Sequence, residues 1–211
     1  MNKKFLMGIL VLIVAGFVAA PAFAAISGSA HDFSSETWSG GQLCVVCHTP
    51  HNASTALPAP LWNHAATAAS FTVYSSPTLN AGVLPQPGPS SKACLSCHDG
   101  TVAIDSFGGA TGSEFVTGSD LVGTDLANDH PVSFTYDTAL ATADGGLFDP
   151  ATKTVSILGD KSIKDGMLIG DKVECGSCHD VHKTKGYSTS SSKLLLVSNA
   201  GSGLCLTCHN K

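Results

Sequence analysis

The feature that most constrains this chain is a short motif, Cys-x-x-Cys-His, which occurs four times and uses all eight cysteines. The cysteines pair as Cys44 and Cys47, Cys94 and Cys97, Cys175 and Cys178, and Cys205 and Cys208, followed by His48, His98, His179 and His209. This motif attaches c-type haem, because its thiols can bind the porphyrin covalently while its histidine ligates the iron. The sequence therefore predicts four haem c groups per chain.

Two other roles of paired cysteines fit less well. Structural zinc sites combine two Cys-x-x-Cys pairs per ion, but zinc leaves the histidine after every pair unexplained. Disulfides are common in exported chains, but a bridge across two intervening residues closes a very small loop and constrains little. Haem attachment accounts for the cysteines and the histidines together.

The N-terminus has the features of an export signal. Two lysines precede an apolar run from Phe5 to Ala20, and Ala22-Phe-Ala24 matches a small-x-small cleavage site. We expect residues 1–24 to be a signal peptide and residues 25–211 to be the mature chain. No later stretch is apolar enough to cross a bilayer. We therefore expect no stable membrane span after cleavage and a secreted location, extracellular or at the outer cell surface, with the periplasm as the alternative.

Charge and composition narrow the function classes. The chain has 11 lysines, no arginine and 16 acidic residues, for a formal net charge of −5. Without Lys3 and Lys4 the balance is 9 against 16, or −7. Such a chain lacks the basic footprint of a nucleic-acid-binding protein. Glycine is abundant, at 22 residues, and only 7% of residues are aromatic. We expect porphyrin surfaces to replace much of the side-chain core, and the haem-free chain to be largely disordered.

Few stretches have a strong secondary-structure pattern. We expect a mostly irregular multihaem cytochrome fold, with short α-helices at the haem motifs and a small β-rich insertion, built around a haem core. The expected helical turns are Leu43–Asn52, Lys92–Gly100, Glu174–Lys183 and Leu204–Asn210. Alternating residues predict strands at Phe71–Tyr74 and Val132–Tyr136, and a hairpin that pairs Leu147-Phe148 with Thr154–Leu158.

The chain contains an internal duplication. In each half a histidine comes first, then a motif with a further histidine three residues beyond it, then a second motif. The first half, about 25–110, has His31 and His51 around the motifs for haems I and II. The second half, about 120–211, has His130 and His182 around the motifs for haems III and IV. His64 has no counterpart in the second half and is therefore the least necessary of these histidines.

The second axial ligand of each iron decides what the haems can do. His31, His51, His64, His130 and His182 lie outside the motifs, and four of them would complete four irons. Met167 is the only methionine after the signal, so at most one haem could have a methionine ligand. His51 and His182 are too close to their own motifs to reach the far face of the same iron, so each must serve a different haem. Bis-histidine ligation leaves no open iron, which indicates electron transfer rather than enzyme activity.

Several segments resemble the doubled-CXXCH multihaem cytochromes of metal-reducing bacteria, and the chain is most similar to the OmcE-type tetrahaem cytochromes. These segments are Thr49-Pro-His51-Asn-Ala, Pro60-Leu-Trp-Asn-His64, Cys94-Leu-Ser-Cys-His-Asp-Gly-Thr-Val-Ala103 and Asn128-Asp-His130-Pro. The resemblance implies self-association into an extracellular filament with a continuous line of stacked haems, in which one axial histidine can come from a neighbouring subunit. It also implies other redox proteins or extracellular electron acceptors as partners.

Two other functions compete with a filament subunit. A soluble periplasmic shuttle packs four haems with less chain between the motifs, so the long interval from Thr101 to Lys172 counts against it. A multihaem oxyanion reductase needs a five-coordinate iron, and the surplus of histidines counts against that. If the haems follow the chain order, His51 of one subunit would approach haem IV of the next. Ligation of haem II within its own chain is the alternative for His51.

Overall fold

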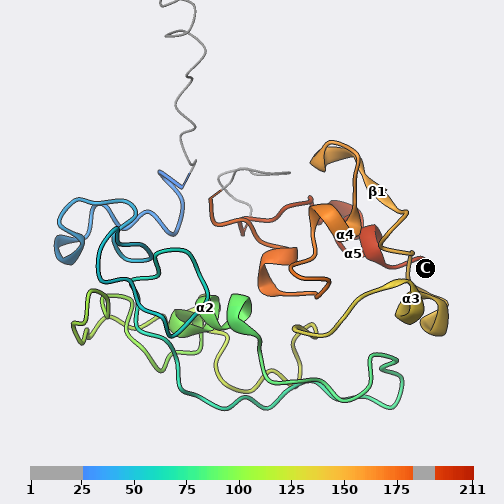
Figure 1. Cartoon of the computed structure of the whole chain (residues 1–211), viewed down its shortest axis with the longest axis horizontal. Helices are drawn as coiled ribbons and strands as arrows, with labels where there is room; N and C mark the ends of the chain where they lie inside the picture. Colours follow the sequence, from blue (N-terminus) through green and yellow to red (C-terminus); the bar gives the residue numbers. More distant parts are fainter. Residues whose placement is uncertain (1–25, 183–192) are drawn as a thin grey trace, which may run out of the picture.

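The computed structural model describes residues 26–182 and 193–211, and most of this chain forms loops and turns (Figure 1). The predicted signal peptide lies outside the described residues. The α-helices are α2 (Pro89–His98), α3 (Thr138–Asp144), α4 (Ile163–Gly166) and α5 (Cys205–Cys208). Strands β1 (Thr154–Val155) and β2 (Lys161–Ser162) pair antiparallel. Single 3-10 turns are η1 (Thr37–Ser39), η2 (Gly118–Asp120), η3 (Ser156–Leu158), η4 (Cys175–Ser177) and η5 (Ala200–Ser202).

Helix α2 lies near the middle of the molecule and carries the second motif (Figure 1). It begins after Gly88, which is extended, and Pro89 occupies its first turn, where the missing N–H costs nothing. Its buried face is Ser91, Leu95 and Ser96. Leu95 packs in a small apolar cluster with Phe71 and Leu126, whereas the serines let neighbouring backbone approach closely. The helix contacts η4, where the third motif begins, so the two halves meet here.

The second half contains a side-chain core that the composition did not lead us to expect. Eight buried residues form one cluster: Tyr136, Ala141, Val155, Leu158, Ile163, Met167, Val173 and Leu196. Two capped helices border it, because Asp137 accepts the Leu140 N–H at the start of α3 and Ser162 accepts the Asp165 N–H at the start of α4. The expectation that haems alone supply the core is therefore too strong for this half.

The structure corrects several predicted elements. Leu43–Asn52 forms turns and no helix, and η4 replaces the helix predicted at Glu174–Lys183, of which Lys183 lies outside the described residues. Phe71–Tyr74 and Val132–Tyr136 form only isolated bridges, Thr72 with Asp125 and Thr135 with Lys172. The predicted hairpin of Leu147-Phe148 with Thr154–Leu158 is wrong, because β1 pairs with β2 and Leu147 bridges His209. The helices predicted at Lys92–Gly100 and Leu204–Asn210 are present as α2 and α5.

The mostly irregular chain, the short helices and the small two-stranded sheet agree with the expected fold class. In Figure 1 the two halves lie largely side by side along the long axis, with α3, α4, α5 and β1 gathered at one end. The loop at Asn80 reaches across and donates a hydrogen bond to Asp144 of α3 over 2.9 Å. Within the described residues, no helix has the length and apolar character needed to cross a membrane.

Candidate haem-binding site

The four Cys-x-x-Cys-His segments, here motifs I to IV in chain order, are held by two kinds of local structure. In motifs I and III the residue after the histidine donates its N–H to a leucine carbonyl: Thr49 to Leu61 at 2.8 Å, and Asp180 to Leu194 at 2.7 Å. A return bond then reaches the second cysteine, from Asn63 to Cys47 at 2.9 Å and from Leu196 to Cys178 at 2.8 Å. The same backbone clamp therefore holds the first motif of each half.

The clamp is shared by motifs I, III and IV and is absent from motif II, so it matches the internal duplication only at the first motif of each half. Leu61 and Leu194 both adopt positive φ values, 54° and 59°, which are uncommon for leucine. In motif IV the pattern recurs, because Asn210 donates to Gly146 and Phe148 donates to Cys208, both at 2.8 Å. Motif II differs, since it lies on α2. The clamps join residues that lie apart in the sequence, so the spacing within the motifs does not predict them.

The backbone also fixes the orientation of the motif histidines. The Nδ1 atoms of His48, His98 and His179 lie 2.8, 2.7 and 2.6 Å from the carbonyl oxygens of Pro60, Asp120 and Lys193. A carbonyl oxygen only accepts, so each Nδ1 carries the proton and donates it. That leaves Nε2 as the free lone pair of the neutral ring, which is the arrangement typical of metal-ligating histidine.

Three of the four motif histidines face a histidine from outside the motifs. The ring centroids of His31 and His98 are 5.9 Å apart, and those of His130 and His209 are 6.4 Å apart. Each of these two pairs lies within one half. The third pair joins the halves, because the rings of His48 and His182 are stacked 6.1 Å apart with an interplanar angle of 21°.

His179, the histidine of motif III, has no such ring partner among the described residues. Of the predicted distal histidines, His51 is the one left over, and its side chain is exposed. It lies at an open pocket of about 500 Å³ beside motif I, which Val45, Asn63 and Phe107 also line. The structure therefore leaves one motif histidine and one exposed histidine unmatched within a single chain.

His64 and Met167 are occupied elsewhere. His64 is only 1% exposed, and its Nδ1 and Nε2 lie 2.7 Å and 2.9 Å from the carbonyl oxygens of Ala65 and Ala103. A neutral ring donates from only one of these nitrogens, and the Cys97 Sγ atom also lies 3.4 Å from Nε2. Met167 is 3% exposed inside the core cluster of the second half. That His64 is the least necessary of the five histidines stays a prediction.

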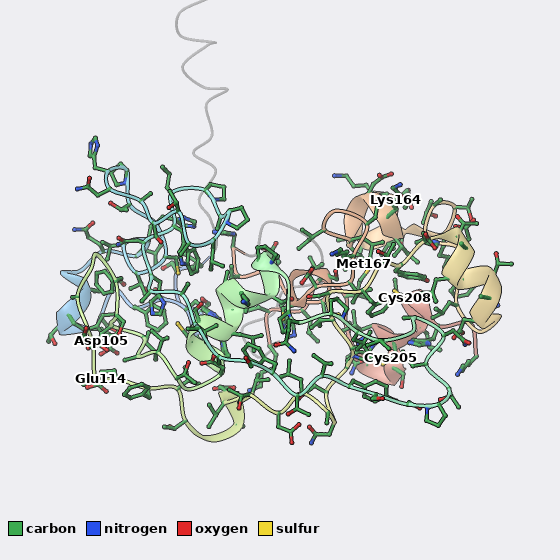
Figure 2. The ribbon with its side chains drawn as sticks, turned by 60° about the horizontal axis from the view of Figure 1, so that its bottom comes forward. Asp105, Glu114, Lys164, Met167, Cys205 and Cys208 are labelled. Atoms are coloured by element: carbon green, nitrogen blue, oxygen red, sulfur yellow. The ribbon has the colours of Figure 1, made fainter. Side chains whose placement is uncertain are left out.

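The thiols place the motifs next to one another in chain order. Burial, followed by the charge on Cys47, raises the pKa of the Cys97 thiol to about 12, so motifs I and II are close. A hydrogen bond from Cys94 lowers the pKa of Cys175 to about 7, which joins motifs II and III. Burial, followed by the charge on Cys178, raises the pKa of Cys208 to about 12, which joins motifs III and IV. Cys205 and Cys208 lie on α5, far from Asp105 and Glu114 (Figure 2).

Two buried polar atoms beside these motifs lack a protein partner. They are Nδ1 of His31 and Nε1 of Trp62. The His31 ring contacts His98, and the Trp62 ring contacts His48 edge-on at 6.3 Å. Buried polar groups are nearly always hydrogen-bonded, so an additional group with acceptor or ligand-binding capacity fits both places. Burial lowers the pKa of His31 to about 4, which keeps its ring neutral and able to act as a ligand.

All eight cysteines are unpaired thiols in the structure. The described residues contain no group of three or more His, Cys, Asp or Glu side chains arranged around a common metal position. The described residues instead bring three pairs of histidine rings together, with centroids 5.9, 6.1 and 6.4 Å apart. A scan of protein-family models finds no match for the chain, and a search of curated proteins finds none.

Proposed function

We propose that this chain is an extracellular electron-transfer protein that binds four c-type haems and assembles into a filament. The observation that carries the proposal is the set of three histidine pairs, each combining one motif histidine with one histidine from elsewhere. Haem supplies four in-plane nitrogens and reversible one-electron chemistry when it is bound. The protein would supply the thiols and the histidine rings.

The ring separations support a metal between each pair. Two metal–imidazole bonds of about 2.0 Å and two half-rings of about 1.1 Å add up to roughly 6 Å between centroids. The three observed separations are 5.9, 6.1 and 6.4 Å. The oriented Nδ1–H groups keep Nε2 free for this role. His31 would serve haem II, His130 haem IV and His182 haem I.

The unmatched histidines support assembly between copies of the chain. By the duplication, His51 corresponds to His182, and His182 of the second half faces His48 of the first half. The equivalent contact for His51 is with His179 of a second half, and among the described residues of one chain neither His51 nor His179 has a histidine ring opposite it. We therefore assign His51 to haem III of a neighbouring subunit. This differs from the expectation of haem IV or haem II, because His130 faces His209 and His31 faces His98.

A contact between His51 of one subunit and His179 of the next can repeat from subunit to subunit. Each subunit offers one His51 and one His179, so the two contact surfaces differ and the association is head-to-tail. A head-to-tail contact that does not close into a ring gives a filament. The chain-order contacts between the motifs, from I to IV, would carry the line of haems through each subunit.

The missing partner of His179 also favours a second function, a multihaem oxyanion reductase with haem III as its five-coordinate iron. The proposal is tested by measuring haem content and ligand state together with particle shape. Purified holoprotein should carry four covalent haems by mass, show low-spin spectra, bind no carbon monoxide when reduced and assembled, and form filaments in negative-stain electron microscopy. Discrete particles in which one haem binds carbon monoxide would favour the reductase.

A further inference from the structure

Glu174 is a buried carboxylate at the joint between the two halves. Its side chain is 4% exposed, and the surrounding Ser91, Ser133 and Ser177 are 0%, 1% and 3% exposed. The hydroxyls of Ser91 and Ser133 both donate to its Oε2 atom, Ser133 over 2.8 Å. Neither ion pair of the described residues includes Glu174. The Glu174 side chain also accepts the backbone N–H of Ser177 in a capping box at the start of η4. A buried carboxylate that is held by neutral donors and has no cationic partner keeps much of its field.

This carboxylate lies between two haem motifs. Glu174 directly precedes Cys175 of motif III, and the Ser91 hydroxyl oxygen accepts the N–H of Cys175 over 3.1 Å. Ser91 is three residues before Cys94 of motif II, one turn earlier on α2. The Glu174 charge acts on both thiols, since it contributes to raising the pKa of Cys94 and opposes the lowering of the pKa of Cys175. The Glu174 carboxylate therefore lies close to cysteines of two motifs, Cys94 of motif II and Cys175 of motif III.

Glu174 also helps to hold in place the segments that carry motifs II and III. The Ser133 hydroxyl that donates to Glu174 accepts the Gly88 N–H over 2.8 Å, just before α2. The Glu174 N–H bonds the Ser177 hydroxyl over 2.9 Å within motif III. The same three serines thus tie α2, the loop after His130 and η4 to one carboxylate.

We propose that the Glu174 carboxylate lowers the reduction potentials of haems II and III. This inference rests on the proposed four-haem function. Ferric haem carries one more positive charge than ferrous haem, so a nearby buried negative charge favours the ferric state. Burial and local charge are among the means by which proteins adjust haem potential.

The test is Glu174→Gln in the holoprotein, followed by spectroelectrochemical titration. Glutamine keeps the shape and accepts a hydroxyl hydrogen bond but removes the charge. Two of the four midpoint potentials should move upward, while the other two stay in place. The matched control is Glu114→Gln, an exposed carboxylate in which the same substitution should shift none. No shift, an equal shift of all four potentials, or the same shift in the control would overturn the inference.

A second variant covers the case in which Glu174→Gln fails to take up haem. Ser133→Ala keeps the charge and removes a hydroxyl dipole that offsets it, so the same two potentials should move downward. An upward shift or no shift would overturn the inference. Haem content is measured first in the wild-type protein. Four haems with unmoved potentials contradict only the role of Glu174, whereas fewer than four contradict the proposed function as well.

Discussion

Replacing His51 with alanine tests the link between ligation and assembly most directly. Within one chain, three motif histidines have a histidine opposite them and His179 has none. His51→Ala should therefore leave three haems low-spin and make one high-spin, one haem in four by the motif count. The same variant should form no filaments, because the ligand that joins neighbouring subunits is gone.

The assay combines absorbance, electron paramagnetic resonance and electron microscopy. Diluting the wild-type protein should convert the same single haem to high spin as subunits separate, whereas the His51→Ala spectrum should not change with concentration. Added imidazole should restore the low-spin spectrum of the variant without restoring filaments. Low-spin ligation of all four haems in dilute monomers of His51→Ala would refute the reasoning, and so would intact filaments.

His182→Ala is the matched comparison for His51→Ala. Because His182 faces His48 of its own chain, its loss should make haem I high-spin at every protein concentration. The variant should therefore show one high-spin haem when assembled and two when diluted, against none and one in the wild-type protein. A His182→Ala protein whose haem spectrum returns to fully low-spin on assembly would contradict the assignment of His182 to haem I.

Three further changes probe the parts around the haems. His64→Ala should keep four low-spin haems and lower the free energy of unfolding by about 1–3 kcal/mol in a denaturant titration, because a buried carbonyl oxygen loses the N–H that the imidazole donates; a high-spin haem would contradict this. Ile163→Ala, at a fully buried position of the second-half core, should cost about 2–5 kcal/mol without changing the haem spectrum, and a smaller loss than for an exposed Ile157→Ala control would count against that core. The pKa of His31 is lowered from 6.5 to about 4, so its neutral ring contributes stability above pH 6.5 that is lost as the pH falls through about 4. Low-spin absorbance should accordingly persist from pH 7 to pH 5, and a high-spin signal appearing at pH 6 in the assembled protein would refute this.

The prediction of haem chemistry rests on short local patterns in the sequence. The motif identifies the thiols and the histidine that follows them as candidate haem-binding residues. The five remaining histidines are enough to supply four second ligands. The matching of rings is not local. His182 faces His48 because the two halves are packed together, and nothing in the spacing of either segment encodes that contact.

Secondary structure was predicted well only where the backbone follows its intrinsic preference. The α2 segment has proline in its first turn, where a helix begins without losing a hydrogen bond. At motif I the helical prediction failed because Thr49 and Asn63 bond across to a neighbouring segment, which pulls the chain out of helical geometry. At Ser133 a φ of 68° interrupts a run whose alternation suggested a strand. These are tertiary contacts overriding local propensity.

The contact between His48 and His182 affects the order in which the proposed haem sites can form. A chain that emerges from its N-terminus presents motif I early, while the ring that faces its histidine follows more than half a chain length later. Under the proposed function, haem I would therefore lack its second histidine until nearly all of the polypeptide has emerged. Closing so long a loop is slow compared with local helix formation. Premature truncation before His182 would leave an open iron at the start of the chain, a place for peroxide or nitric oxide to react.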